Sequence, residues 1–218
     1  MTRLYVLVEG QTEEAFINEL VVPHYAALGI YFTPVVVQTS PGYRGGLASF
    51  GKVKPQIQKL CKCDANAYVT TMFDLYGLPH DFPGKSNPIY RSLGNGRDKA
   101  QLLESELMRE IELPNFIPNL TLHEFETLLF VNLAAFTPWT DSDHCLAELH
   151  KVRGTTAPED INDGPSTAPS KRIKAAMPRY QKTFHGPLIA IDIGLDAMRR
   201  ECPHFDAWLA KIEALNPN

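Results

Sequence analysis

Acidic side chains end two apolar segments in the first third of the chain. Glu9 follows the apolar run of residues 5–8, and Asp74 ends the run AYVTTMFD. A carboxylate is costly to bury without a partner, and proteins with parallel α/β sheets bind ligands at the carboxyl ends of their strands. We therefore expect the two side chains to face one functional crevice.

Further carboxylates occur at positions that could reach the same crevice. Glu13 lies one helical turn after Glu9, and the motif HEFE contains Glu124 and Glu126 directly after a later strand signal. Hard divalent cations such as Mg2+ prefer a few carboxylate oxygens, with water in the remaining positions. Paired metal ions can stabilise both the attacking and the leaving oxygen of a phosphodiester. The pattern therefore indicates a metal site for phosphodiester chemistry.

Some of these residues also have a purely structural interpretation. Thr12 is a suitable helix N-cap, and Glu13 would then only favour the positive end of that helix. Thr121 and Glu124 match a capping box. If Glu124 and Glu126 are both helical, they point to nearly opposite sides and cannot both bind one metal ion.

Two kinds of cationic group could assist such a site. The densest basic stretch is PSKRIKAAMPRYQK, which contains Lys171, Arg172, Lys174, Arg179 and Lys182. Lys171 or Arg172 could offset phosphate charge at a metal centre, whereas a solvated helix face is the alternative for most of the stretch. His123 could bind phosphate or transfer a proton, but a single histidine near a strand end more often has a structural role.

The composition is that of a globular protein without an overall basic surface. The chain has 218 residues, of which 44% are hydrophobic, and a formal net charge of -4. No apolar stretch approaches the roughly 20 residues of a membrane span, and the N-terminus shows no signal-peptide pattern. We therefore expect a cytoplasmic protein that does not associate with membranes. Any nucleic-acid binding must use a local basic patch, a partner or an oligomer.

Strand and helix signals alternate in the first half of the chain. Strands are expected at residues 3–8, 31–39 and 67–74, with helices at 12–28 and 52–62 between them. Strands separated by helices of this length imply parallel pairing and an α/β sandwich.

The second half has a different pattern. The expected elements are, in order, a Pro/Gly-rich loop at residues 75–96, a helix at 97–113, a strand at 116–123 and a helix at 124–130. Residues 137–185 are interpreted as a helical and loop insertion, and the tail as two short helices broken at Pro203. The chain, residues 1–218, is expected to form a single domain.

Three motifs together give the chain a family resemblance. VEGQTE, FDLYG and HEFETLLF resemble the Toprim superfamily, in particular an uncharacterised bacterial Toprim-like family and the Toprim nuclease domain of overcoming-lysogenization-defect proteins. The resemblance implies a Rossmann-like Toprim core, a mostly parallel sheet flanked by helices, with a C-terminal helical insertion or extension. It also implies phosphodiester chemistry that depends on Mg2+ or Mn2+, and an ATPase partner in phage defence.

The same resemblance assigns metal ligands and exposes one departure. It maps the metal-binding glutamates onto Glu9 and Glu13, and the aspartate of the later strand onto Asp74. Toprim domains usually carry D-x-D, whereas this chain has Tyr76 at the second aspartate. We expect the HEFE glutamates or Asp81 in the long loop to compensate.

Our leading hypothesis is a metal-dependent Toprim-type nuclease that hydrolyses DNA or RNA with water as the nucleophile. It would be the effector of a defence system with an AAA- or ABC-type ATPase. The expected metal ligands are Glu9, Glu13, Asp74 and Glu126; Glu124 and Lys171 complete the expected catalytic set, with Lys171 stabilising phosphate charge. The first alternative is a catalytically degenerate Toprim-like binding or regulatory subunit. The second is an α/β enzyme that acts on small phosphorylated or nucleotide substrates.

Overall fold

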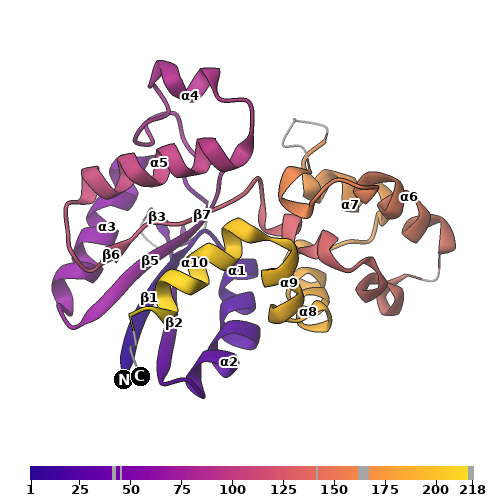
Figure 1. The fold of residues 1–218 in the computed structure, drawn as a ribbon, viewed down its shortest axis with the longest axis horizontal. Coiled ribbons are helices and arrows are strands. Elements are labelled where there is room, and N and C mark those ends of the chain that lie inside the picture. Colours follow the sequence, from indigo (N-terminus) through magenta and orange to yellow (C-terminus); the bar gives the residue numbers. More distant parts are fainter. Residues whose placement is uncertain (41–42, 45, 141, 162–166, 216–218) are drawn as a thin grey trace.

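The fold is built on a parallel sheet, seen in a computed structural model that describes residues 1–40, 43–44, 46–140, 142–161 and 167–215 (Figure 1). The strands are β1 (Thr2–Val8), β2 (Ile30–Val36), β5 (Ala67–Asp74), β6 (Phe116–Ile117) and β7 (Leu120–Thr121). Their order is β2-β1-β5-β6, and β7 also pairs with β5. Every pairing in this sheet is parallel, which confirms the predicted α/β class.

Helices cover both faces of the sheet. The helices of the first half are α1 (Gln11–Phe16), a π-helix (Ile17–Val21), α2 (Val22–Ala26), α3 (Phe50–Cys63), α4 (Pro88–Ser92) and α5 (Gly96–Ile111). A short hairpin, β3 (Gln38–Ser40) and β4 (Tyr43–Arg44), follows β2. In Figure 1, α3 and α5 lie on one side of the sheet, and α1, α2 and α10 lie on the other.

The side chains of β1 and β5 alternate between two cores. Val6, Val8 and Met72 belong to the larger core, which also contains side chains of α1, α2 and the C-terminal helices. Leu7 and Phe73 belong to the second core, under α3 and α5. All five side chains are at most 1% exposed. Strands buried on both faces are typical of parallel sheets, and this burial rigidly fixes the ends of β1 and β5.

The second half of the chain is helical. Its elements are the 3₁₀ helices η2 (Phe125–Val131), η3 (Leu133–Trp139) and η4 (Pro158–Asp160), and the α-helices α6 (Asp143–Arg153), α7 (Pro169–Ala176), α8 (Lys182–Ile193), α9 (Leu195–Glu201) and α10 (Pro203–Glu213). Figure 1 shows α6 and α7 in a lobe beside the sheet, from which the chain returns through α8 and α9 to α10.

Two expectations about helices differ in detail from the structure. Residues 124–130 were expected to be α-helical, but η2 is a 3₁₀ helix that begins at Phe125. The tail forms three helices rather than two, because Gly194, with φ of 80°, ends α8 before the expected break near Pro203.

None of the helices in the described part of the chain is long and apolar enough to cross a membrane.

The strand expected at residues 116–123 is interrupted at Asn119. Thr71 of β5 faces the gap: its hydroxyl donates to the carbonyl of Asn119 (2.7 Å) and accepts from the Asn119 N–H (3.0 Å). These side-chain bonds replace the ladder bonds that an unbroken strand would form. The sheet margin is therefore two two-residue strands, β6 and β7.

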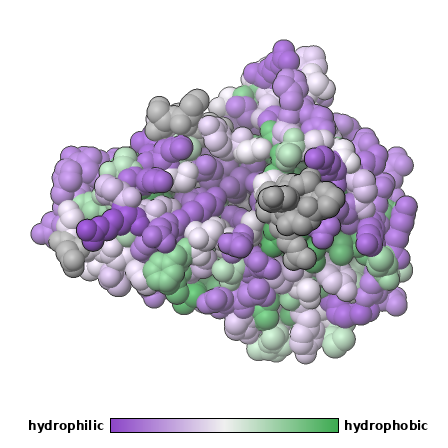
Figure 2. Space-filling model, turned by 180° about the vertical axis from the view of Figure 1, so that it is seen from behind, coloured by the Kyte–Doolittle hydropathy of each residue, from purple (hydrophilic) through white to green (hydrophobic). Residues whose placement is uncertain are grey.

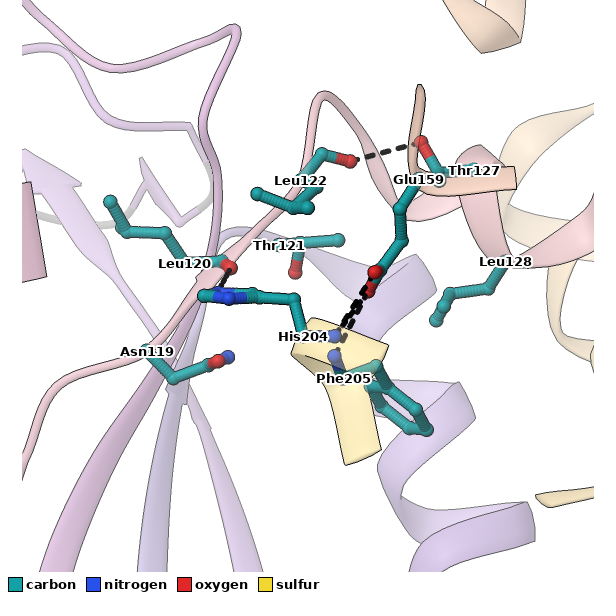
Figure 3. A pocket seen from close by; sticks show the side chains of 9 residues that line it. All are labelled: Asn119, Leu120, Thr121, Leu122, Thr127, Leu128, Glu159, His204 and Phe205. Carbon is teal, nitrogen blue, oxygen red and sulfur yellow. Dashed lines mark hydrogen bonds between the residues drawn. The ribbon is translucent and has the colours of Figure 1, made fainter. Parts of the chain in front are cut away.

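A buried glutamate joins the helical lobe to the rest of the molecule (Figure 3). The carboxylate of Glu159 accepts the backbone N–H groups of His204 and Phe205 at 3.0 to 3.1 Å, which caps α10. It also lies 3.3 Å from Arg97 of α5. The cavity beside it has a volume of about 10 Å³, which holds one water molecule and not a substrate. This joint is structural.

Candidate active site

The HEFE turn is attached to the end of β5 by backbone hydrogen bonds. Leu75 N–H donates to the Thr121 carbonyl and Tyr76 N–H donates to the His123 carbonyl, both at 3.0 Å. His123 has a φ of 62°, a left-handed conformation that non-glycine residues rarely adopt. Its ring is buried with Nε2 3.0 Å from the Glu159 carbonyl, so the structural interpretation of this histidine fits its position.

Asp74 links three of the loops that meet at this edge. Its Oδ1 accepts the Phe125 N–H at 2.9 Å, at the start of η2. Its own N–H donates to Glu9 Oε1 at 2.7 Å. Glu9 and Asp74 therefore lie together at the carboxyl ends of the adjacent strands β1 and β5.

One ammonium group lies among the acidic side chains. Lys182 Nζ, at the start of α8, is 3.2 Å from Glu126 Oε2, 3.5 Å from Asp74 Oδ2 and 3.7 Å from Glu13 Oε1. Glu126 is 0% exposed and Glu13 3% exposed, whereas the Lys182 side chain is 39% exposed. The lysine thus reaches from solvent into a buried carboxylate cluster.

Burial dominates the protonation of this cluster. It raises the pKa of Glu9 to about 7; the Asp74 N–H opposes this increase and the nearby Glu13 carboxylate adds to it. Burial also raises the pKa of Asp74 and of Glu126, against the opposing charge of Lys182. Burial alone would lower the pKa of Lys182, but the attraction of Asp74, Glu126 and Glu13 outweighs it and the net shift is upward. The surrounding carboxylates therefore favour the charged form of Lys182, while burial favours the protonated forms of Glu9, Asp74 and Glu126.

Glu124 is not helical. The objection that Glu124 and Glu126 would point to opposite sides of one helix therefore does not apply. It precedes η2 with φ of -146° and ψ of 162°, and its Oε2 accepts the Ser170 N–H of α7 at 2.9 Å. Its charge raises the pKa of both Glu9 and Glu126, so it lies near both. The predicted capping box with Thr121 is wrong, because Thr121 belongs to β7.

The N-cap interpretation of VEGQTE is also wrong. The N-cap residue of α1 is Gly10, whereas Thr12 and Glu13 lie inside the helix and are buried. Glu13 therefore faces the carboxylate cluster rather than solvent, as its distance to Lys182 shows.

Three other predicted positions lie outside this cluster. Lys171 is exposed on α7, and within the described residues it forms no ion pair with these carboxylates. Asp81 caps α3, where it accepts the Phe50 and Gly51 N–H groups and the Ser49 hydroxyl, so it does not replace the missing aspartate. Tyr76 is 42% exposed.

Lys182 is the functional candidate that sequence reasoning did not select. It belongs to the basic stretch identified in the sequence. The positive charge of that stretch does not indicate which of its five cationic residues has a functional role. Its position at the first residue of α8, which packs on α1, brings it to Glu13. Only the long-range packing of α8 identifies it.

The donor set suits a hard divalent cation. Four carboxylates lie at this edge, and the fully buried Glu126 Oε2 is paired with the Lys182 ammonium, 3.2 Å away. A buried carboxylate oxygen of this kind is a ligand that Mg2+ or Mn2+ prefers. In the described part of the chain no three His, Cys, Asp or Glu side chains are close enough to hold a metal as they stand; the ammonium lies among them instead.

The space-filling view from behind shows a hydrophilic hollow near the middle of that face, between the broad part of the molecule and the narrower helical lobe (Figure 2). Fold and site together define a parallel α/β protein with a carboxylate cluster at the carboxyl ends of its strands.

Comparison with known proteins places the chain in a family. A family model described as "Domain of unknown function (DUF4276)" matches residues 8–213, and the chain belongs to this family. No curated protein matches the chain.

Two solved structures are similar to it. One is the C-terminal region of the Burkholderia pseudomallei OLD protein, with 16% identity, a TM-score of 0.49 and all of both chains covered. The other is the C-terminal region of the Xanthomonas campestris pv. campestris OLD protein, with 18% identity, a TM-score of 0.42, and 96% of this chain and 95% of that chain covered. Neither similarity, at a TM-score below 0.5, assigns an activity to this chain.

Proposed function

We propose that this protein is a metal-dependent, Toprim-type nuclease that hydrolyses phosphodiester bonds of DNA or RNA. The observation that carries the proposal is the convergence of Glu13, Asp74 and Glu126 within 3.7 Å of one cation position. These side chains come from α1, β5 and η2, three separate parts of the chain. Burying several carboxylates together is unfavourable unless a cation compensates them, so the arrangement favours a site for positive charge.

Each residue has a defined part in the proposed site. Glu9, Glu13, Asp74 and Glu126 would hold Mg2+ or Mn2+, which when bound lowers the pKa of a water molecule and stabilises phosphate charge. The Phe125 N–H orients Asp74, and the Asp74 N–H orients Glu9. Asp74 and Glu9 are therefore presented at fixed positions before any ligand arrives.

Two further groups complete the proposed set. Lys182 would neutralise charge at the reacting phosphate. Glu124, held by the Ser170 N–H, would add negative charge beside Glu9 and Glu126. Lys171, which is exposed, would contact phosphate outside the carboxylate cluster.

The test is a cleavage assay with supercoiled plasmid and with single-stranded RNA, in Mg2+ and in Mn2+. Wild type should nick or degrade one of them. Glu9→Gln and Glu126→Gln should each reduce the rate by about 10- to 100-fold or more, because even loss of a group that only supports a metal ligand costs that much. Ile191→Ala, an exposed position on α8, serves as the control. Equal rates in wild type and Glu126→Gln would contradict the proposal.

A specific observation favours one alternative, a binding or regulatory subunit that has lost catalysis. Tyr76 stands at the expected second aspartate, and Lys182 already compensates the cluster that remains. Calorimetry that detects no Mn2+ binding at millimolar concentration would support this alternative.

The proposal includes a partner and a setting. We infer from the sequence resemblance that an AAA- or ABC-type ATPase delivers the substrate or activates the nuclease, in an anti-phage system of the cytoplasm. The net charge of -4 fits this division of work, because the isolated chain has little long-range attraction for nucleic acid. Cleavage should therefore be measured with and without an AAA- or ABC-type ATPase.

A further inference from the structure

The basic stretch at residues 169–182 has an unusual local charge. It holds five of the 21 Lys and Arg residues of an otherwise acidic chain, and no Asp or Glu occurs from residue 164 to residue 191. A local patch of this kind can bind a polyanion even when the net charge of the protein is negative.

Both ends of the stretch are attached to the carboxylate cluster. At its start, the Ser170 N–H donates to Glu124. At its end, the Lys182 ammonium lies 3.2 Å from Glu126. The stretch therefore begins and ends beside the proposed active site.

The cations between the two attachment points point outward. Lys171, Lys174 and Arg179 are exposed, and within the described residues none of them forms an ion pair. Lys171 and Lys174 are three residues apart on α7, so they share a helix face. Arg172 differs, because its Nε donates to the Thr167 carbonyl at 2.7 Å. Three cations are thus available to an external ligand.

An exposed aromatic ring follows directly after these cations. Phe184 is 53% exposed, and the edge-to-face contacts that hold it are with Trp139 at 5.8 Å and His185 at 5.0 Å between ring centroids. His185 in turn stacks on Tyr180 at 5.9 Å. The ring is therefore supported from within while part of it faces solvent, the arrangement of a stacking platform for an unpaired base.

We propose that residues 171–184 form a strand-binding strip that guides a single-stranded nucleic acid into the carboxylate cluster. Lys171, Lys174 and Arg179 contact phosphates. Phe184 is two residues after Lys182 and therefore on a different side of α8, where it stacks on an unpaired base outside the carboxylate cluster. This inference rests on the proposed nuclease function and names its substrate class: an unpaired strand, or a duplex with an unpaired segment.

The test is fluorescence anisotropy with a labelled 20-nucleotide single strand and the matching duplex, in EDTA so that no cleavage occurs. The triple variant Lys171→Gln, Lys174→Gln, Arg179→Gln should bind the single strand more weakly. The slope of log K against log salt concentration should become shallower by about 0.7 for each contact removed. Lys62→Gln, at an exposed lysine on α3, should leave affinity and slope unchanged.

Phe184→Ala should weaken single-strand binding by roughly tenfold or more, the effect expected for loss of one stacked base. Phe184→Trp should preserve it, duplex affinity should not change, and Ile191→Ala should behave as wild type. An unchanged salt slope in the triple variant would overturn the phosphate contacts. Equal loss of single-strand and duplex binding in Phe184→Ala would overturn the stacking role.

Cleavage and binding measured on the same variants distinguish the strand-binding strip from the proposed nuclease site. Glu126→Gln should abolish cleavage and keep single-strand binding. If Glu126→Gln still cleaves while the triple variant loses binding, the strip is supported and the proposed active site is wrong. If wild type binds neither oligonucleotide, the strip is overturned, and an acidic partner protein becomes the better explanation of its charge.

Discussion

At the residue scale, Lys182 is the side chain on which the carboxylate cluster depends most. Three buried or nearly buried acidic groups share its ammonium. Its side chain is 39% exposed, so the ammonium is reached from solvent while it compensates buried carboxylates. A metal ion bound by these carboxylates would have to take over that compensation.

Lys182→Met should destabilise the metal-free protein by roughly 1–3 kcal/mol, because it leaves buried carboxylates without their counter-charge, an effect reduced by the partial exposure of the lysine. The loss should be smaller at pH 5, where more of the carboxyl groups are protonated. Urea denaturation at pH 5 and pH 8 measures both. Lys171→Met, an exposed lysine without such partners, is the matched control; an equal effect of the two changes would contradict the assigned role.

The raised pKa of Glu9 predicts a pH dependence. Its pKa is about 7 in the folded protein and near 4.5 when unfolded, so the fold favours the protonated form. This contribution to stability is complete below pH 4.5 and is lost as the pH rises through 7. The free energy of unfolding of the metal-free protein should therefore fall between pH 5 and pH 8, and Glu9→Gln should flatten the curve. A wild-type curve that rises over this range would be the opposite result.

At the element scale, two acidic side chains cap the N-terminal ends of helices on different parts of the molecule. Asp81 in the long loop caps α3 at the surface. Glu159 caps α10 in the interior (Figure 3). It also joins the helical lobe to α5 through Arg97. The two caps make the same kind of hydrogen bond in different surroundings.

Asp81→Ala should cost about 1 kcal/mol of stability, the usual value for a lost helix cap. Glu159→Ala should cost more, on the order of 2–3 kcal/mol, because it leaves buried N–H groups unsatisfied. Thermal and chemical denaturation of the two variants give the comparison. Asp81→Ala should also leave Mn2+ affinity unchanged; a marked loss of affinity would restore Asp81 as a metal ligand.

At the scale of the whole molecule, the candidate site joins parts of the chain that are distant in sequence. Glu9 directly follows β1 and Asp74 ends β5, whereas Glu126 and Lys182 come from the helical second half. A ligand held by all of them ties the two halves together. Its binding should therefore increase the global stability of the protein and not only change the structure locally.

Mn2+ should raise the thermal midpoint of the wild-type protein. At a concentration of 100 times its Kd, linkage predicts a gain of about 2.7 kcal/mol. Glu126→Gln should abolish most of the shift, and differential scanning fluorimetry with Mn2+ titration measures it. A shift of the same size in Glu126→Gln would mean that Mn2+ binds elsewhere.

Much of this arrangement could be predicted from sequence, for identifiable reasons. The apolar runs before Glu9 and Asp74 marked buried strands, and the ends of parallel strands meet at one edge, so their proximity followed. The location of Lys182 and the cap formed by Asp81 depend on contacts between distant segments, which local spacing does not encode. The extended conformation of Glu124 was hidden because HEFE also matches a helix start.

The margins of the sheet restrict how the molecule can associate with others. On one side β2 carries Pro34 opposite Val6, and proline offers no N–H to a neighbouring strand. On the other side, the break at Asn119 leaves only β6 and β7, each two residues long. Short or proline-containing margins discourage the addition of a foreign strand. We expect the protein to resist fibril-like aggregation through its sheet, and any assembly to form through helices or loops.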